Sequence, residues 1–481
     1  MVRAIVLAAN ASIRRRFLRS LLVVGLVAVT AAAWFGLVSL PPEPRGPVAA
    51  AAPGTGPHAP PSTSATPTPT SVRTATGERS PAPAPTSGAP QIADPGVAGT
   101  GVSTRPMIRI PATGPPSGTA ETRKALTLRL ASLRASYGLP GVSVAILFSD
   151  GSMWRGTSGF ADLKAKRRVT PDTEFAIASI SKTFLATLIL KLAEERKLDL
   201  ETPVTAYLPD LAIDPSTTVH QLLDHTSGLH DYFYDPRIDR ALLANPRRVW
   251  TAGDALGYVG KPYFKPGEGW HYSNTNYLIL GMLAEAVGGE PLPEQLHARF
   301  LTPLGLDHTH YQGVDAPLGP LARAYRFDGP GLRRPAVPLT DGTNVIPFTS
   351  VVTAAGSAGS IASTAEDLVT WAKALYSGQV LTPPMFSAMV ADAQFTAQFQ
   401  PSIPYGLGVQ VATIDGRTSL GHSGRLLGSR TVVRWLPDEG IAIAVLTNQS
   451  RNDPNLVARA LLRVVLGAPV ECTGCPAPIQ P

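Results

Sequence analysis

The sequence predicts an α/β domain in which one sheet is assembled from strands at both ends of the folded chain, with a helical insertion between them. An early apolar run, Val142–Phe148 (VSVAILF), is typical of a buried strand. Two late segments, Thr431–Trp435 and Ile441–Leu446, also have strand patterns and are joined by the turn Pro437–Gly440. The long stretch between the early and late strands carries mostly helical patterns.

The helices are predicted from apolar residues at three- and four-residue spacing. In Arg123–Tyr137 these residues are Leu126, Leu130 and Leu133, and Gly138 marks the end of the helix. Similar patterns predict later helices at Phe184–Leu198, Asn276–Val287, Ala365–Tyr376 and Val457–Leu466.

The first forty residues predict an export segment. Residues 1–20 hold five arginines, and the next twenty, Leu21–Leu40, carry no charge. Twenty residues of helix match the hydrocarbon thickness of a bilayer, and the basic flank predicts that the N-terminal side stays in the cytoplasm. The segment is predicted to be a transmembrane anchor or a cleaved signal peptide. We therefore expect a single-pass protein of the cell membrane with its folded domain outside the cytoplasm, or a secreted protein.

Residues 41–118 predict a disordered linker. They hold 19 prolines among 78 residues, with Ala, Thr, Ser and Gly making up most of the rest. Such a composition buries too little apolar surface to offset the entropy lost on folding. The folded domain is expected over residues 119–467, followed by a C-terminal tail, 468–481.

The net charge of +7 belongs to the N-terminal segments. Ten of the 42 basic and three of the 35 acidic residues precede Thr119, so the rest of the chain holds 32 of each. This balance argues against a nucleic-acid-binding protein, which needs a basic face on its folded part. The two cysteines, Cys472 and Cys475, lie in the tail and either pair there or stay free, so no disulfide framework is expected in the folded body.

The sequence Ser179-Ile180-Ser181-Lys182 can place a nucleophile beside a base. If Ser179 lies in the first turn of the helix that follows, the three-residue spacing stacks Lys182 over it. A serine hydroxyl is a poor nucleophile until a base removes its proton, and a lysine can do so where desolvation lowers its pKa. Alone, the motif is equally compatible with two solvated side chains on a helix face.

Two further motifs supply groups that such a centre needs. In Tyr272–Asn274 (YSN), the tyrosine can relay a proton and the asparagine amide can hold a substrate carbonyl. In His422–Gly424 (HSG), the first two residues lie between Gly421 and Gly424, and a strand of small residues there lets a substrate backbone lie alongside it. Standing alone, the two motifs are interpreted more simply as a loop with a turn-forming asparagine and as a surface turn.

With these motifs, the chain resembles the class C β-lactamase and D-alanyl-D-alanine carboxypeptidase-like serine hydrolases, a penicillin-binding-protein-like family with a Ser-x-x-Lys signature. The supporting stretches are FAIASISKTF (175–184), KLDLETPVTAYLP (197–209), VHQLLDHTSGL (219–229), FKPGEGWHYSNTNYLILG (264–281), AGSIASTAEDLVTWAKAL (358–375) and GHSG (421–424). They cover most of Gly141–Asn448 in family order. The resemblance implies a β-lactamase/transpeptidase-like fold: an antiparallel sheet flanked by helices, a mainly helical subdomain, and the site between them.

The resemblance also implies a role for each motif residue. The catalytic residues would be the nucleophile Ser179, its base Lys182 and the proton relay Tyr272. Substrate would be bound by Asn274, His422, Ser423 and Gly424. The oxyanion would be held by the backbone N–H groups of Ser179 and Arg425. No metal and no cofactor is expected.

Two residues depart from the family pattern. His422 stands where β-lactamases of this family usually carry lysine. With an ordinary pKa of about 6.5 it is mostly neutral at pH 7 and recognises a carboxylate less firmly, which disfavours a β-lactamase role. Arg425 stands where a small residue is common, and its side chain either supplies the missing charge or crowds the site.

Other histidines have simpler interpretations. His225, in the sequence DHTSG, matches a family loop and is interpreted as mostly structural. His308 and His310 can indicate a metal, but no carboxylate–histidine constellation accompanies them in the sequence, so metal binding is not expected there.

The sequence is therefore interpreted as an extracytoplasmic serine hydrolase that works through an acyl-enzyme. The expected substrate is a peptide or amide ending in D-alanine, such as a cell-wall stem peptide, and the alternative is an esterase or β-lactamase of the same family. A non-catalytic envelope receptor for peptidoglycan or β-lactams is a further alternative, against which the intact motifs argue. The expected partners are a small-molecule or peptide substrate and, through Leu21–Leu40, the membrane. No nucleic acid is expected, and the sequence does not set the oligomeric state.

Overall fold

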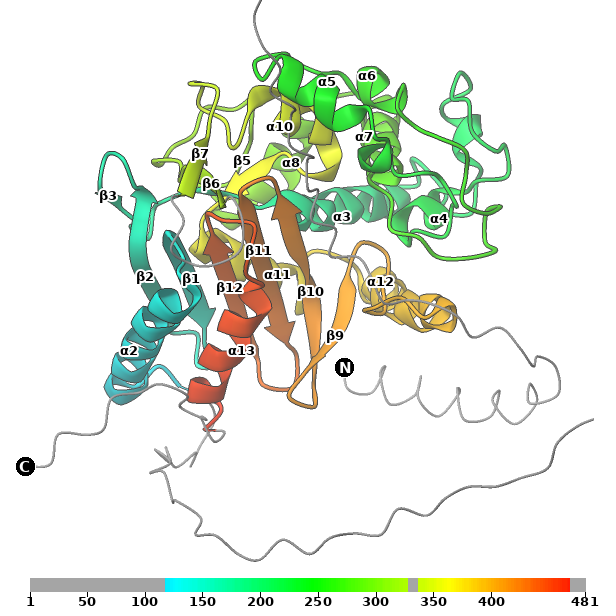
Figure 1. Cartoon of the computed structure of the whole chain (residues 1–481). Coiled ribbons are helices and arrows are strands. Elements are labelled where there is room, and N and C mark those ends of the chain that lie inside the picture. Colours follow the sequence, from blue (N-terminus) through cyan, green and yellow to red (C-terminus); the bar gives the residue numbers. More distant parts are fainter. Residues whose placement is uncertain (1–116, 328–335, 468–481) are drawn as a thin grey trace, which may run out of the picture. The chain divides into compact units, whose positions relative to one another are not determined.

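A computed structural model describes residues 117–327 and 336–467, and its largest element is a seven-stranded antiparallel sheet (Figure 1). The strands are ordered β3-β2-β1-β12-β11-β10-β9. Their bounds are β1 (Gly141–Leu147), β2 (Met153–Asp162), β3 (Arg167–Arg168), β9 (Gln410–Ile414), β10 (Arg417–Leu426), β11 (Ser429–Leu436) and β12 (Ile441–Thr447). The predicted sheet built from both chain ends is confirmed, because β1 pairs with β12 and places Val144 opposite Val445.

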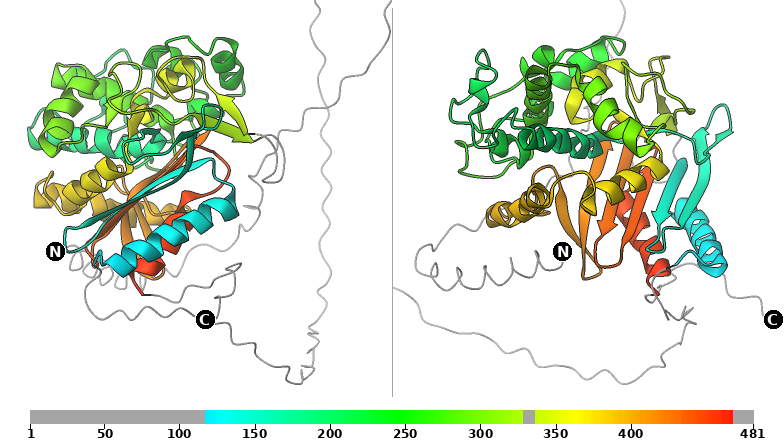
Figure 2. Two further views of the ribbon diagram at one scale, coloured as in Figure 1. Left: turned by 90° about the vertical axis from the view of Figure 1, so that its left-hand side faces the viewer. Right: turned by 180° about the vertical axis from the view of Figure 1, so that it is seen from behind.

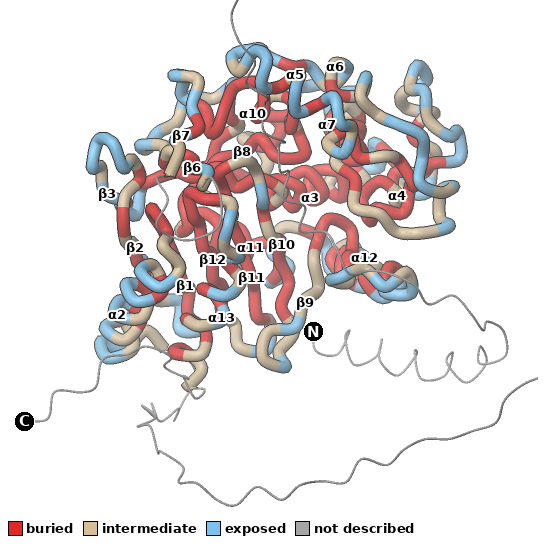
Figure 3. Tube along the Cα trace, in the orientation of Figure 1, coloured by how far each residue is buried: buried red, intermediate tan, exposed pale blue. Residues whose placement is uncertain are grey.

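Strand β1 is buried on both faces, which explains why all its residues except Ser143 are apolar or glycine (Figure 3). Val142, Val144 and Ile146 belong to the core on one side of the sheet. Ala145 and Leu147 belong to the core on the other side, as the two-residue period of a strand requires. The sheet therefore separates two hydrophobic layers.

Helices α2 (Ala120–Tyr137) and α13 (Pro454–Val465) cover the first face of the sheet (Figure 2). Thr119 caps α2 by accepting a hydrogen bond from a backbone N–H of its first turn, and Gly138 ends the helix in a left-handed conformation. Helix α13 begins earlier than predicted, behind the capping side chain of Asp453. Both predicted helices are present.

The second face packs against α11 (Ala365–Tyr376), which in turn contacts α3 (Ser181–Glu194). The contact includes the stacked rings of Phe184 and Trp371, whose centroids are 4.2 Å apart. Helix α3 starts earlier than predicted because a 3₁₀ turn, Ala178–Ile180, leads directly into it.

The middle of the chain forms the predicted helical part, above the sheet in Figure 1. Its helices are α4 (Val219–Leu223), α5 (Ile238–Ala244), α6 (Ala252–Leu256), α7 (Asn274–Gly288), α8 (Leu292–Leu296), a π-helical turn (His297–Leu301), α9 (Thr302–Leu304) and α10 (Thr349–Ala355). Helix α12 (Pro383–Thr396) then leads back towards β9. Two small sheets were not predicted: β4 (Phe175–Ala176), β8 (Ile361–Ser363) and β5 (His310–Tyr311) form one, and β6 (Ala324–Phe327) and β7 (Ala336–Leu339) the other.

Several predictions concern residues outside the described part of the chain. They are the basic segment 1–20, the export segment Leu21–Leu40, nearly all of the linker 41–118, and the tail 468–481 with its two cysteines. Among the residues that the structure describes, no helix has both the length and the apolar character needed to cross a membrane.

Candidate active site

Ser179 lies in the 3₁₀ turn between β4 and α3, where the small sheet meets the helical subdomain. The residue before it, Ala178, has a φ of +51°. This left-handed conformation costs a residue with a β-carbon about 1–2 kcal/mol, so packing must maintain it. Part of that packing is a hydrogen bond of 2.9 Å from the Thr431 hydroxyl on β11 to the Ile177 carbonyl. The main sheet thus helps to fix the position of the nucleophile.

Gly424 on β10 allows the sheet to approach this turn closely. A β-carbon at this position would lie 2.1 Å from the carbonyl oxygen of Ile177, far inside van der Waals contact. The last position of the HSG motif therefore needs glycine, because only glycine allows the two backbones to approach this closely. Its predicted contact with substrate stays a prediction.

Lys182 is buried in the first turn of α3 beside Ser179, as the three-residue spacing predicts. Its Nζ donates to Ser179 Oγ at 3.3 Å. It also donates to Asn274 Oδ1 at 2.8 Å and to the Ala358 carbonyl at 2.7 Å. Burial lowers the pKa of Lys182 from 10.5 to about 7, although nearby Asp231 opposes the change. A substantial fraction of the amine is therefore neutral near pH 7 and able to accept a proton.

The ring of Tyr272 lies against the same amine, with Lys182 Nζ 5.1 Å from the ring centroid. The Tyr272 hydroxyl is buried and makes no hydrogen bond of ordinary geometry within the described residues. Burial raises its pKa well above the usual value near 10, and Ser179 lies near enough to oppose part of the rise. The phenol thus stays protonated, and its hydroxyl is a donor available to a bound substrate.

Asp231, which the motifs did not indicate, orients Asn274 at the start of α7. Asn274 accepts from Lys182 through Oδ1 and donates through Nδ2 to Asp231 Oδ2 at 2.8 Å. These two bonds determine which side of the amide faces the lysine. Asp231 is itself buried and accepts from the Phe233 N–H at 3.0 Å. In the sequence, Asp231 is typical of a turn residue, and no motif there indicates its contact with Asn274.

His422 lies on β10 with its ring buried. Nδ1 lies 2.6 Å from the Ser423 carbonyl, to which it donates, so Nε2 accepts from the Tyr405 hydroxyl at 2.9 Å. Burial lowers the pKa of His422 to about 3, and Lys182 adds to this effect. The sequence predicts a mostly neutral ring from the ordinary pKa of about 6.5. The lowered pKa makes the ring fully neutral at pH 7. With both nitrogens engaged, it has no free donor for a substrate, so its predicted binding role requires those bonds to change.

The neighbouring residues of β10 have different surroundings. Ser423 donates from its N–H to Gln410 Oε1 at 3.2 Å, and the same oxygen accepts from buried Arg434 at 2.8 Å. The side chain of Arg425 is exposed, and its strand partner is Arg430. Because the Arg425 side chain is exposed, the prediction that it supplies charge is favoured over the prediction that it crowds the site. The predicted oxyanion role of the Arg425 N–H stays a prediction.

His225 lies in an aromatic cluster next to these residues. It is fully buried, has a φ of +69°, and accepts at Nδ1 from the Ser273 N–H at 3.2 Å. Its ring centroid lies 4.3 Å from that of Tyr272 and 4.7 Å from that of Tyr405. This arrangement agrees with a structural residue that holds the segment carrying Tyr272.

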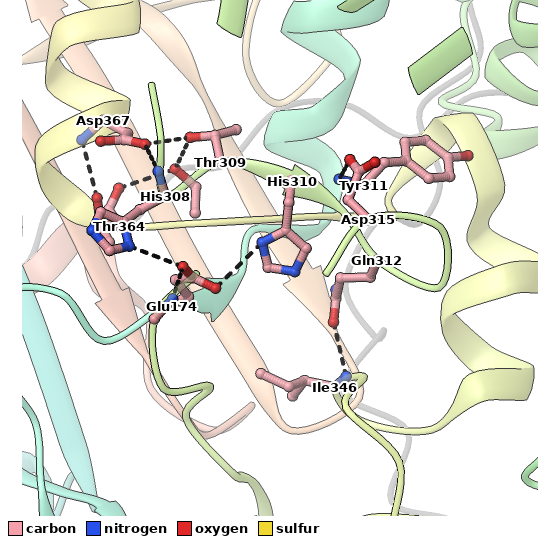
Figure 4. Close-up of polar contacts among 12 residues, drawn as sticks. Glu174, His308, Thr309, His310, Tyr311, Gln312, Asp315, Ile346, Thr364 and Asp367 are labelled. Carbon is pink, nitrogen blue, oxygen red and sulfur yellow. Dashed lines mark hydrogen bonds and ion pairs between the residues drawn. The ribbon is translucent and has the colours of Figure 1, made fainter. Parts of the chain in front are cut away.

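The histidines of the HTH sequence contact a carboxylate (Figure 4). Fully buried Glu174 accepts from His308 Nδ1 at 3.0 Å. It lies 3.3 Å from His310 Nδ1, without the alignment of a hydrogen bond. The expectation that no carboxylate accompanies these histidines is therefore wrong. Glu174 directly precedes β4, so this network supports the segment that leads to Ser179.

A serine beside a buried amine of low pKa, held between a sheet and a helical subdomain, is the centre of a serine hydrolase. The β-lactamase family profile matches residues 126–467, which is most of the chain. The chain belongs to the β-lactamase family.

Curated relatives include penicillin-binding proteins and aminopeptidases. Penicillin-binding protein 4 of Amycolatopsis lactamdurans is 30% identical over 336 residues, which cover 66% of this chain and 84% of that protein. The D-aminopeptidase of Brucella anthropi is 27% identical over 339 residues, or 70% of this chain. The chain spans 61% of the length of that relative.

Solved structures show the same fold. A D-stereospecific amidohydrolase from Streptomyces sp. is 28% identical with a TM-score of 0.59, over 72% of this chain and 98% of that one. The D-amino acid amidase from Ochrobactrum anthropi SV3 is 24% identical with a TM-score of 0.60, over 72% and 99% of the two chains. The similarity to the D-amino acid amidase is a similarity of fold alone.

Proposed function

We propose that the protein hydrolyses amide bonds of D-amino acid compounds through an acyl-enzyme on Ser179, with peptides or amides ending in D-alanine as the favoured substrates. The observation that carries this proposal is the buried Lys182 amine, 3.3 Å from Ser179 Oγ. The D-configured substrate class is supported by the similarity to a D-aminopeptidase and to a D-stereospecific amidohydrolase.

In the proposed acylation step, Lys182 takes the proton of Ser179 Oγ, which attacks the substrate carbonyl carbon. The N–H groups of Ser179 and Arg425 stabilise the resulting oxyanion. When the C–N bond breaks, Tyr272 gives its proton to the leaving amine and regains one from Lys182. Water then attacks the ester, releases the acid and restores the Ser179 hydroxyl.

The neutral ring of His422 favours a second candidate, an esterase for small acyl esters. A substrate with a free carboxylate needs a cation near the HSG motif. His422, with a pKa of about 3, carries no charge at pH 7. Amides and esters without such a carboxylate do not pay this electrostatic penalty. Penicillins, cephalosporins and peptides with a free C-terminal D-alanine carry one, so a neutral His422 favours D-amino acid amides and small esters over all three.

Labelling and a substrate panel test these candidates. A fluorophosphonate or a fluorescent penicillin is expected to label the wild type and not Ser179→Ala, and equal labelling would remove Ser179 as the nucleophile. Turnover is then compared on a D-alanyl-D-alanine peptide, D-alanine amide, L-alanine amide, p-nitrophenyl acetate and a chromogenic cephalosporin. Faster cleavage of D- than of L-amides supports the main proposal, and turnover of the ester alone supports the esterase. Labelling without any turnover indicates a non-catalytic receptor.

We also propose that the domain works outside the cytoplasm, anchored through Leu21–Leu40 or secreted. The support is the uncharged run of twenty residues behind five arginines. Protease accessibility in intact spheroplasts tests the location, and recovery of the full-length chain in the cytosol would refute it. N-terminal sequencing of the mature protein separates an anchor from a cleaved signal peptide.

A further inference from the structure

We infer that His220, Asp224 and Asp392 form a binding site for a divalent cation of the zinc type, where α4 meets α12. One candidate ligand atom from each side chain lies within 4.8 Å of the other two. Within residues 117–327 and 336–467, no other group of histidine, cysteine or acidic side chains has this geometry. Ligand atoms around tetrahedral zinc are about 3.4 Å apart, so side-chain shifts of about 1 Å would bring these three ligands into place, with a water as the fourth.

His220 is already held in the manner of a metal-binding histidine. Its Nδ1 donates to Glu201 Oε1 at 2.6 Å, and its Nε2 lies 2.9 Å from Asp392 Oδ1. Histidines that bind metals almost always donate their second ring N–H to a carboxylate, carbonyl or water, which fixes the ring and raises its basicity. Glu201 serves as that outer partner, and Nε2 is the atom presented to the cation.

Asp224 has a buried carboxylate oxygen without a hydrogen-bond partner among the described residues. Its side chain is fully buried, and Oδ1 accepts from both the N–H and the hydroxyl of Thr226, at 2.9 and 2.7 Å. Its Oδ2 has no hydrogen-bond partner. Asp392, whose side chain is only 9% exposed, also has an unpartnered Oδ2. Buried carboxylate oxygens without partners are costly, and a cation bound by both side chains would offset the desolvation cost and the repulsion between the two carboxylates.

The donors select the class of cation. One imidazole nitrogen and two carboxylate oxygens suit zinc, or a similar ion such as cobalt, better than magnesium or calcium, which prefer shells made only of oxygen. The two carboxylates balance the charge of one divalent ion, and His220 becomes the third ligand by releasing the Nε2 proton that otherwise bonds to Asp392. The His-x-x-x-Asp spacing places the first two ligands one helical turn apart, and Asp392 comes from a distant helix.

A cation at this position would connect two segments that support the active site. The Asp224 carbonyl accepts from the Trp270 indole N–H at 2.8 Å, two residues before Tyr272. Asp392 lies on α12, from which the chain continues to Tyr405, the partner of His422. The ion would be structural and would touch no reacting atom, so the inference is independent of the proposed hydrolysis.

Metal titration of the full chain tests the inference. Cys472→Ser and Cys475→Ser first remove the tail thiols as competing ligands, and a chelator strips the protein. Calorimetric titration with zinc is expected to show one ion per chain and at least tenfold weaker binding by Asp392→Asn than by Asp210→Asn, which replaces an exposed acid. Zinc is also expected to raise the thermal unfolding midpoint of Asp210→Asn and not that of Asp392→Asn.

Two further measurements make the test specific. Glu201→Gln is expected to weaken zinc binding about 10–100-fold and to keep one site per chain, because it changes only the outer partner of His220. Circular dichroism checks that each variant folds, and His220→Gln replaces Asp392→Asn if the latter does not. Equal zinc affinity of the ligand variant and the exposed control, or no zinc bound at all, overturns the inference and leaves His220 as a protonated side chain bonded to Glu201 and Asp392.

Discussion

Replacing Lys182 by arginine tests whether a neutral amine is the base. With a pKa of about 7, half of the Lys182 side chains are neutral at pH 7. At the usual value near 10.5 only about one in 3,000 would be. An arginine guanidinium stays charged throughout this range. Loss of a general base costs about 10²–10⁴ in rate, so Lys182→Arg is expected to slow acylation at pH 7 about 10³-fold.

The assay is the rate of acylation by a fluorescent penicillin or a chromogenic ester between pH 5 and 9. Because only the neutral amine accepts a proton, the wild-type rate is expected to rise about tenfold per pH unit and to level off above the pKa of about 7. Lys197→Arg, which changes an exposed lysine, is the control and is expected to keep this profile. A wild-type rate that still rises at pH 9, or undiminished acylation by Lys182→Arg, would refute the reasoning.

Three other predictions follow from the contacts of the site. Asp231→Asn is expected to loosen the amide of Asn274 and lower kcat about 100-fold while the unfolding midpoint changes little; a change in KM alone would contradict the positioning role. Gly424→Ala is expected to cost about 1–3 kcal/mol in urea unfolding, because its β-carbon meets the Ile177 carbonyl; unchanged stability and activity would show that the turn can move. The free energy of unfolding of the wild type is expected to rise relative to that of Lys182→Met between pH 7 and 10, by at most about 5 kcal/mol. In that interval the unfolded chain binds a proton at Lys182 that the folded chain has lost, so parallel pH curves would argue against the lowered pKa.

Features set by local spacing were predictable from the sequence. The three-residue spacing of Ser179 and Lys182 specifies a helical stack, and the structure has it. The apolar strands at both chain ends, including Val142–Phe148, predicted one sheet, since an apolar strand must find partners that bury it. Burial of His422 was not predictable, because it depends on Tyr405, which approaches from a separate loop.

Contacts between distant polar residues could not be predicted. Glu174 meets His308 across 134 residues, and His220 meets Asp392 across 172. Neither carboxylate belongs to a motif with its histidine, and a single sequence gives no pattern that pairs them. The contact of Asp231 was not predictable for the same reason, because its partner Asn274 lies 43 residues away.

The pairing of β1 with β12 has a consequence for how the enzyme is made. Val144 emerges from the ribosome about 300 residues before its partner Val445, so the sheet lacks its centre for most of synthesis. The segment that carries Ser179 depends on Thr431 and Gly424, which are also made late. A partly synthesised chain therefore contains the nucleophile without the strands that position it, and hydrolytic activity begins only when the last strands have been translated.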